Sequence, residues 1–265
     1  MKVNILLNRF GVYFGLIMVL CGQAEAGKKL ILFGGGGYTP KAVAKFVDLA
    51  GGKNAKILIL PWATSQPESE FYHLKEVFEA HSPSKLLRGL SPDEKSYSKA
   101  ELILQIESVT GVFFPGGNQV DLMKRINFDL EIREMLLRAY HNGVVFGGYS
   151  AGTAIASKTM ITGLGDFTVV DPSKVEVAEG LGLVTRFVVD QHFIARQRQN
   201  RLLSVLQKSK ENLGIGIDED TALVLEDEQR GFVLGRSYIT VFQRKKSSKN
   251  FEVSLLKEGD SLIIP

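Results

Sequence analysis

The sequence has a single cysteine, Cys21, which lies close to its amino-terminal end. The rest of the chain therefore has no disulfide and no cysteine nucleophile, so any covalent catalysis needs another residue type. Histidine is also scarce: the four histidines stand at positions 73, 81, 141 and 192, with no H-x-H or H-E-x-x-H spacing. Because zinc sites are built from clusters of thiolates and imidazoles, the sequence predicts no metal site.

Long apolar runs are missing too, and the amino terminus has only a short one. Lys2 and Arg9 precede an apolar segment over 11–22, and residues 24–26 (Ala-Glu-Ala) have the small-x-small pattern of a cleavage site. This arrangement is typical of a secretory signal peptide, so we expect cleavage after residue 26 and an exported protein, periplasmic or extracellular. The apolar segment is short for a membrane span, and no later run approaches about 18 apolar residues.

Two other interpretations of the amino terminus stay open. A lipoprotein would carry its lipid on Cys21, although Leu20 is not the small residue expected before a lipidated cysteine. An uncleaved anchor would retain the segment. We favour cleavage over both, which leaves residues 27–265 as one domain without a stable membrane span. At about 240 residues, such a domain can bury a core without disulfides.

Neither sign of charge is in large excess. Lys and Arg together number 32 and Asp and Glu 29, so the formal net charge is +3. A charge this close to balance gives no sign of nucleic acids or anionic membranes as partners. We therefore expect neither as a partner.

Apolar runs bounded by glycine alternate with segments of helical periodicity through most of the chain. Runs such as 55–63 and 111–117 lack polar alternation, which is typical of strands buried on both faces. We therefore expect an α/β fold with a mainly parallel sheet flanked by helices. The segment 221–264 alternates more and has short turns, which predicts antiparallel strands added to one edge. A helix is expected to begin at Pro40 with Thr39 as its cap.

The glycine-rich loop 34–39 follows one of these strands, so a dinucleotide site must be considered. The pattern G-x-G-x-x-G fails at Thr39, and the next strand, 55–63, has no acidic residue at its end. No G-K-[ST] follows either. We therefore favour a loop that permits close approach at the carboxyl edge of the sheet, and we predict no cofactor.

Residues 148–152 fit G-x-S-x-G between an apolar strand and a helix, the context of a nucleophile elbow. Small neighbours allow the Ser150 hydroxyl to be exposed on a strained turn, and the amide of Ala151 could donate to an oxyanion. A serine that only caps the helix is the alternative.

A serine nucleophile needs a base, and His192 is the strongest candidate. The other three histidines lie within or at the ends of predicted helices, whereas His192 follows an apolar strand that could end near Ser150. Asp190 shares a face with His192 if the strand continues. Among the acids at 218–220, any one could orient the imidazole, and a solvated turn is equally compatible with their spacing.

Two further segments carry polar groups. In residues 113–122, Gly116 and Gly117 could present backbone amides and Gln119 could bind substrate, although a plain turn capped by Asn118 fits equally well. Three arginines, at 196, 198 and 201, stand at the start of a predicted helix, where cations oppose the helix dipole. Such an arrangement favours an anionic ligand.

Four segments together resemble the cyanophycinase and aspartyl dipeptidase family of serine peptidases. They are PGGNQ, GGYSAGTA, DQHFIARQRQNRL and GIGIDEDTAL, in this order, and they span about residues 30–225. The pattern D-Q-H-F-x-x-R-x-R-x-x-R is similar to the cyanophycinase branch. The resemblance implies a class I amidotransferase-like, flavodoxin-like fold with a serine in place of the cysteine at the elbow.

The resemblance also implies roles for individual residues. Ser150 would be the nucleophile, His192 the general base and Glu219 the acid that orients it. The amides of Gly117 and Ala151 would form the oxyanion hole. The substrate site would be lined by Gln119, Asp190, Gln191, Arg196, Arg198 and Arg201.

The implied substrate is cyanophycin, a polyaspartate chain with arginine joined to each side-chain carboxyl, from which cyanophycinases release β-aspartyl-arginine. An exported enzyme would scavenge polymer released by other cells. Because the family commonly forms dimers, a homodimer is a further expectation. Tyr149 stands where threonine is frequent and Asn200 where glycine is common, and both differences could reshape the pocket.

Three alternatives stay open. Within the family, the substrate could be a small α-aspartyl dipeptide. An esterase of the α/β-hydrolase fold would need Asp190 or Glu176 as its acid, but the order Ser, His, acid differs from that fold's order. A non-catalytic amidotransferase-like module would bind a peptide without cleaving it.

Overall fold

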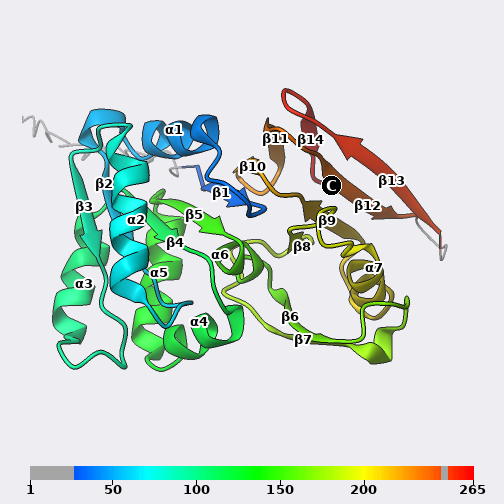
Figure 1. Ribbon diagram of the computed structural model, residues 1–265, viewed down its shortest axis with the longest axis horizontal. Helices are drawn as coiled ribbons and strands as arrows, with labels where there is room; N and C mark the ends of the chain where they lie inside the picture. The colour runs from blue at the N-terminus through cyan, green and yellow to red at the C-terminus, as the bar shows by residue number, and fades with distance from the viewer. Residues whose placement is uncertain (1–26, 246–249) are drawn as a thin grey trace, which may run out of the picture.

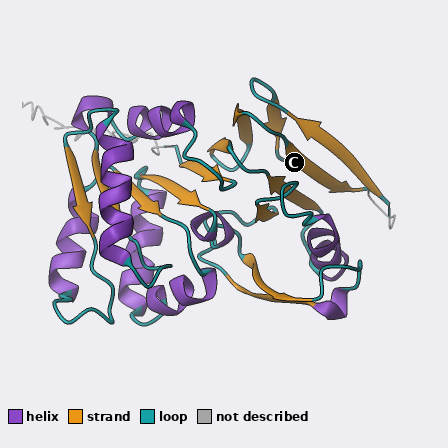
Figure 2. Ribbon diagram, in the orientation of Figure 1, coloured by secondary structure: helices purple, strands orange, loops and turns teal. Residues whose placement is uncertain are grey.

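Figure 1 shows the computed structural model of the chain, which describes residues 27–245 and 250–265. The predicted signal peptide and Cys21 lie outside the described residues. Helices and strands alternate through the first part of the described chain, whereas strands predominate after helix α7, Gln199–Lys208 (Figure 2). No helix in this described part is long and apolar enough to cross a membrane.

The larger sheet has eight strands in the order β14-β11-β10-β1-β5-β4-β2-β3. The last five in this order are parallel, and β10, β11 and β14 add antiparallel pairs at one edge. The prediction of a mainly parallel sheet with antiparallel C-terminal strands is therefore confirmed. The strands are β1 Lys29–Phe33, β2 Lys56–Ile59, β3 Lys85–Arg88, β4 Gly111–Phe114, β5 Val145–Tyr149, β10 Thr221–Glu226, β11 Arg230–Gly235 and β14 Ser261–Ile263.

Helices cover both faces of this sheet, because its strands send apolar side chains to both sides. On β1, Leu30 and Leu32 join the core formed with α3, α4 and α5, whereas Ile31 and Phe33 join the core formed with α1 and α2. The helices are α1 Pro40–Leu49, α2 Pro67–Glu79, α3 Lys99–Ser108, α4 Gln119–Ile126 and α5 Leu130–His141, with short 3-10 turns at Gly52–Asn54 and Pro172–Lys174.

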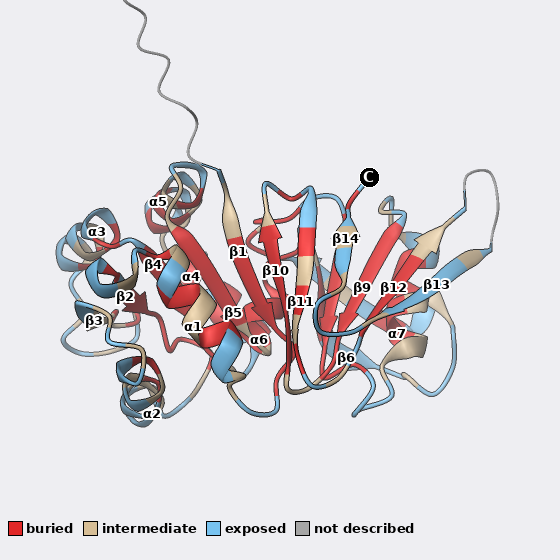
Figure 3. Ribbon diagram, turned by 90° about the horizontal axis from the view of Figure 1, so that it is seen from above, coloured by how far each residue is buried: buried red, intermediate tan, exposed pale blue. Residues whose placement is uncertain are grey.

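A second sheet has four strands in the order β13-β12-β9-β8, of which β8 and β9 are parallel. On β9, Ile215 and Ile217 pack into the larger sheet's core, whereas Val188 of β8 and Phe242 of β12 pack under α7. Strand β13 is the exposed edge (Figure 3). The strands are β8 Val188–Gln191, β9 Leu213–Ile217, β12 Ile239–Arg244 and β13 Phe251–Leu256.

The C-terminal strands therefore divide between two sheets, which the alternation pattern did not distinguish. The chain also contains a two-stranded ribbon, β6 Thr159–Gly165 and β7 Val175–Glu179, which the sequence did not predict. The ribbon and α7 lie on the same side of the second sheet (Figure 1).

Two local expectations need correction. Thr39 occupies the N-cap position of α1, but its side chain makes no capping hydrogen bond, and Pro40 alone marks the start. The helix expected after Ser150 is only one turn, α6 Ala151–Ala154. It ends early because the following residues bond to another segment: the amide of Leu181 donates to the carbonyl of Ile155, 2.7 Å away.

Candidate active site

Ser150 lies on a strained turn between β5 and α6. Its backbone has φ 51° and ψ −103°, a conformation that residues other than glycine rarely adopt. Glycines make the turn sterically feasible: a Cβ on Gly148 would lie 2.3 Å from the carbonyl oxygen of Gly152, and one on Gly152 would lie 2.0 Å from that of Phe114. The G-x-S-x-G spacing therefore folds as an elbow rather than as an ordinary helix cap, and Ser150 makes no side-chain capping bond.

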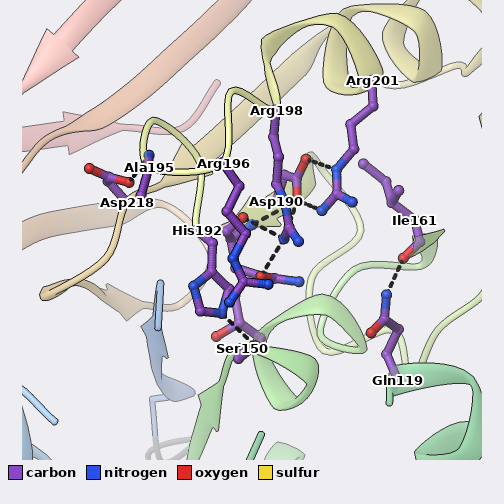
Figure 4. A network of polar contacts seen from close by, with 12 residues as sticks. Gln119, Ser150, Ile161, Asp190, His192, Ala195, Arg196, Arg198, Arg201 and Asp218 are labelled. Atoms are coloured by element: carbon purple, nitrogen blue, oxygen red, sulfur yellow. Dashed lines mark hydrogen bonds and ion pairs between the residues drawn. The ribbon is translucent and has the colours of Figure 1, made fainter. Parts of the chain in front are cut away.

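His192 follows β8 directly and faces the serine. Its Nε2 atom lies 2.8 Å from Ser150 Oγ (Figure 4). The backbone amide of His192 donates to the carbonyl of Gly34 at 2.7 Å. A Cβ on Gly35 would lie 2.1 Å from the imidazole Cε1. The glycine-rich loop therefore permits close approach, as predicted, and the group that approaches Gly35 is the His192 ring.

The three acids after β9 have separate partners. Glu219 Oε1 lies 2.5 Å from His192 Nδ1. Asp218 accepts hydrogen bonds from the amides of Ile194 and Ala195, both at 2.9 Å, and thereby supports the turn after His192. Asp220 accepts a bond from the amide of residue 37 in the glycine loop at 2.6 Å. Of the three acids, Glu219 is the one that contacts the imidazole.

The hydrogen bonds of His192 fix which nitrogen carries the proton in the neutral ring. A carboxylate can only accept, so Glu219 requires a proton on Nδ1, which leaves the Nε2 lone pair directed at the Ser150 hydroxyl. Burial lowers the pKa of His192 below its ordinary value, the hydrogen bond to Glu219 raises it, and the positive charges of Arg196 and Arg198 lower it further. The ring is therefore a neutral acceptor near pH 7.

The turn between β4 and α4 lies beside the serine. A Cβ on Gly116 would lie 3.6 Å from Ser150 Cβ. Gly117 has φ 137°, and a Cβ there would lie 2.1 Å from the carbonyl oxygen of Ala63, so this position requires glycine. Asn118 caps α4 by accepting bonds from the amides of the next turn. The same segment thus both caps a helix and borders the serine.

Two of the predicted arginines are already paired inside the protein. Arg201 Nε donates to Asp190 Oδ2 at 2.7 Å and its Nη2 donates to the other carboxylate oxygen; Arg201 is 2% exposed and Asp190 1%. Arg198 donates from Nη1 to the backbone carbonyl and side-chain oxygen of Gln191, at 2.8 and 2.6 Å. These contacts tie α7 to the end of β8 (Figure 4).

Arg196 is the arginine with the most exposed side chain of the three, at 54%. Its Nε lies 3.7 Å from Glu219 Oε1, and Figure 4 shows it reaching past His192 toward Ser150. A pocket of about 540 Å³ adjoins these residues. Its lining consists of Gly117, Asn118, Gln119, Val120, Ser150, Thr162, Gly163, Leu164, Phe167, Gln191, Arg196, Arg198 and Arg201.

Of the predicted substrate residues, Gln119 reaches the pocket with its amide group fixed. Its Nε2 donates to the carbonyls of Ile161 and Thr162, at 3.0 and 2.7 Å. Because these two acceptors demand the NH₂ group, the amide orientation is determined. Asp190, in contrast, is buried behind the pocket and does not line it.

Sequence reasoning missed several neighbours of the site. Leu164 and Phe167 line the pocket from the unpredicted β6–β7 ribbon. Tyr38 was also missed: it stacks on Tyr149 with ring centroids 4.3 Å apart, and Tyr149 donates its hydroxyl proton to the carbonyl of Gly36. The stacked rings depend on contacts between distant segments, so no local pattern signals them.

No group of acids, histidines and cysteines among the residues the structure describes could hold a metal ion.

Three comparisons relate this chain to known proteins. A model of peptidase family S51 matches residues 30–232. The cyanophycinase of a Nostoc species is 35% identical over 201 residues, which cover 74% of this chain and 66% of that protein. Peptidase E of Streptomyces coelicolor is 26% identical over 160 residues, 57% of this chain and 63% of the relative. The chain thus spans less than two thirds of the length of these curated relatives.

The fold also has a counterpart among solved structures. A peptidase from an acI-B1 Actinobacterium superposes with a TM-score of 0.68 at 19% identity, covering 90% of this chain and 98% of that one. This likeness supports the fold, and the family match includes Ser150, His192 and Glu219 within its range. The chain therefore belongs to peptidase family S51.

Proposed function

We propose that this chain is an exported serine peptidase that uses Ser150, His192 and Glu219 as its catalytic triad, with cyanophycin as substrate and β-aspartyl-arginine as product. The observation that carries the proposal is the continuous line of hydrogen bonds from Ser150 Oγ through both ring nitrogens of His192 to Glu219. Membership of family S51 and similarity to cyanophycinases support it.

In this mechanism Ser150 Oγ attacks the scissile carbonyl while His192 Nε2 accepts the hydroxyl proton. Glu219 stays ionised and stabilises the imidazolium that forms. The imidazolium then gives its proton to the leaving amine, the C–N bond breaks, and an acyl-enzyme on Ser150 remains. Water, deprotonated by the same imidazole, hydrolyses the ester and restores the serine.

The tetrahedral intermediate needs donors for its oxyanion. The amides of Gly117 and Ala151 are suited to this role, because Gly117 borders the pocket that contains Ser150 and Ala151 is the first residue of α6. Donors fixed before the reaction stabilise the transition state without reorganisation.

The charge of the pocket supports a carboxylate-bearing substrate. Among the residues that the structure describes, its lining contains three arginines and no carboxylate. Arg196 is the one best placed to bind a substrate carboxylate directly, because Arg198 and Arg201 already hold Gln191 and Asp190. Burial and the nearby charge of Arg201 lower the pKa of Arg198 to about 10, which leaves it cationic at neutral pH.

An α-aspartyl dipeptide is the second candidate substrate. It is favoured by the apolar side chains on one side of the pocket, Val120 and Leu164, which are 39% and 59% exposed. They could pack against an apolar residue that follows the aspartate. The similarity to a peptidase E supports the same candidate.

The test compares the protein with its Ser150→Ala variant on cyanophycin, aspartyl-leucine and a simple ester. We expect release of β-aspartyl-arginine by the wild type and a loss of about 10⁴-fold or more in kcat in the variant, as for other triads that lose the nucleophile. Hydrolysis of aspartyl-leucine alone would move the chain to the dipeptidase candidate. No turnover of all three would favour a binding module and contradict the proposal.

A further inference from the structure

A second and larger cavity, about 1060 Å³ in volume, lies away from the pocket that contains Ser150. Two members of the candidate triad, His192 and Glu219, follow the carboxyl ends of β8 and β9. The cavity is instead lined by residues that precede these strands, including Arg186 and Asn212, and by the end of α7. Because a strand rises about 3.3 Å per residue, the two sites are separated by the length of these strands, on the order of 15 Å.

The lining of this cavity is strongly cationic. Among the described residues, it contains five basic side chains and one acidic side chain, that of Glu211, whereas the formal net charge of the whole chain is only +3. The basic residues are Lys158, Arg186, Lys208, Lys210 and Arg244.

Neighbouring groups compensate little of this charge. Glu211 accepts a hydrogen bond from the hydroxyl of Thr159 at 2.8 Å. Lys208 donates to two backbone carbonyls, and Arg186 makes one long contact of 3.4 Å to the backbone oxygen of Pro265, the last residue of the sequence. The Nε and Nη2 atoms of Arg244 are buried with no hydrogen-bond partner in the described part of the chain.

The dipole of α7 accounts for only part of the cluster. Lys208 and Lys210 lie at the carboxyl end of α7, where cations complement the helix dipole. Lys158, Arg186 and Arg244 come from three other segments, which this dipole does not stabilise. Like charges gathered in one cavity repel one another, and a bound ligand of opposite charge relieves that repulsion.

We propose that this cavity is a binding site for a small multivalent oxyanion, a molecule that carries two or more carboxylate or phosphate groups. Arg186, which is exposed, can hold such a group through two parallel N–H bonds, and the lysines add point charges. The volume suits a small-molecule ligand. None of the cavity's residues lines the pocket beside Ser150, so the proposal is independent of the proposed peptidase activity.

Titration calorimetry at constant ionic strength tests the proposal, with tricarballylate and pyrophosphate as probes. We expect saturable binding of at least one probe to the wild type, and affinity at least tenfold lower in an Arg186→Gln/Lys210→Gln double variant. Both residues are exposed, so the variant should fold. Preference for tricarballylate would identify a carboxylate ligand, and preference for pyrophosphate a phosphate ligand.

Two control variants distinguish binding in this cavity from a general effect of charge and from binding beside Ser150. The Lys53→Gln/Arg230→Gln variant removes the same charge from exposed positions outside the cavity and should bind like the wild type. Arg196→Gln removes a cation from the other pocket and should also leave this binding unchanged. The proposal is overturned by an absence of saturable binding, by equal weakening in the Lys53/Arg230 variant, or by a loss confined to Arg196→Gln.

Discussion

His192 is surrounded by groups that act on its charge in opposite directions. Its own backbone adopts φ 48°, and its ring lies between Ser150, Glu219 and the backbone of Gly35. Burial lowers the pKa of His192, and so does the charge of Arg196, whereas the hydrogen bond to Glu219 raises it. Because a base must be neutral to accept a proton, activity should be complete above this pKa and fall as the pH drops through it.

Arg196→Gln should therefore move the acid limb of the kcat/KM profile to higher pH, because it removes a cation that lowers the pKa of His192. In the wild type the limb should lie below the ordinary histidine value. The Arg196→Lys variant keeps the positive charge at this position and serves as the control, with its acid limb expected near that of the wild type. A profile whose acid limb lies at the same pH in all three proteins would contradict the assignment of the limb to a His192 whose pKa Arg196 lowers.

At the scale of single residues, the sequence indicated which residues belong to the candidate site better than it indicated which of them are in contact. His192 could be identified by elimination, because no other histidine follows an apolar strand. Spacing alone could not choose among Asp218, Glu219 and Asp220, since adjacent residues in a turn share the same pattern, and only the family resemblance implied Glu219. The backbone conformation after β9 alone directs Glu219 to the imidazole and the other two to backbone amides.

At the scale of elements, the connection between β8 and α7 is held by a buried ion pair. Arg201 on α7 contacts Asp190 on β8 through two hydrogen bonds, and both side chains are almost fully buried. The arginines predicted as substrate anchors thus differ in burial. Arg201 is buried and holds α7 on β8, whereas Arg196 is exposed and faces the pocket. Sequence spacing does not indicate which arginine is buried, because burial depends on how α7 packs on the second sheet.

Arg201→Met should lower the free energy of unfolding by about 3 kcal/mol or more, because it leaves Asp190 as an uncompensated buried charge. Chemical denaturation measures this change directly. The Asp190→Asn/Arg201→Met double variant should recover part of the loss, since no buried charge remains unpaired. A loss in Arg201→Met no larger than that in the exposed Arg196→Gln control would contradict the structural role of the pair.

At the scale of the whole molecule, the site depends on two sheets. Ser150 comes from the larger sheet, whereas His192 and Glu219 follow strands of the second. The sequence predicted the parallel sheet because buried apolar runs and intervening helices are local signals. The second sheet was not foreseen, because strand pairing between β8, β9 and β12 joins segments far apart in the chain.

The measurement that tests the central claim most directly is mass spectrometry of the protein after acid quenching during turnover of an aspartyl peptide. If Ser150 of the larger sheet is the nucleophile and His192 of the second sheet activates it, the peptide that contains Ser150 will carry the acyl group of the substrate. The Ser150→Ala variant will carry none. An acyl group on another residue, or continued turnover by Ser150→Ala, would contradict the proposed mechanism.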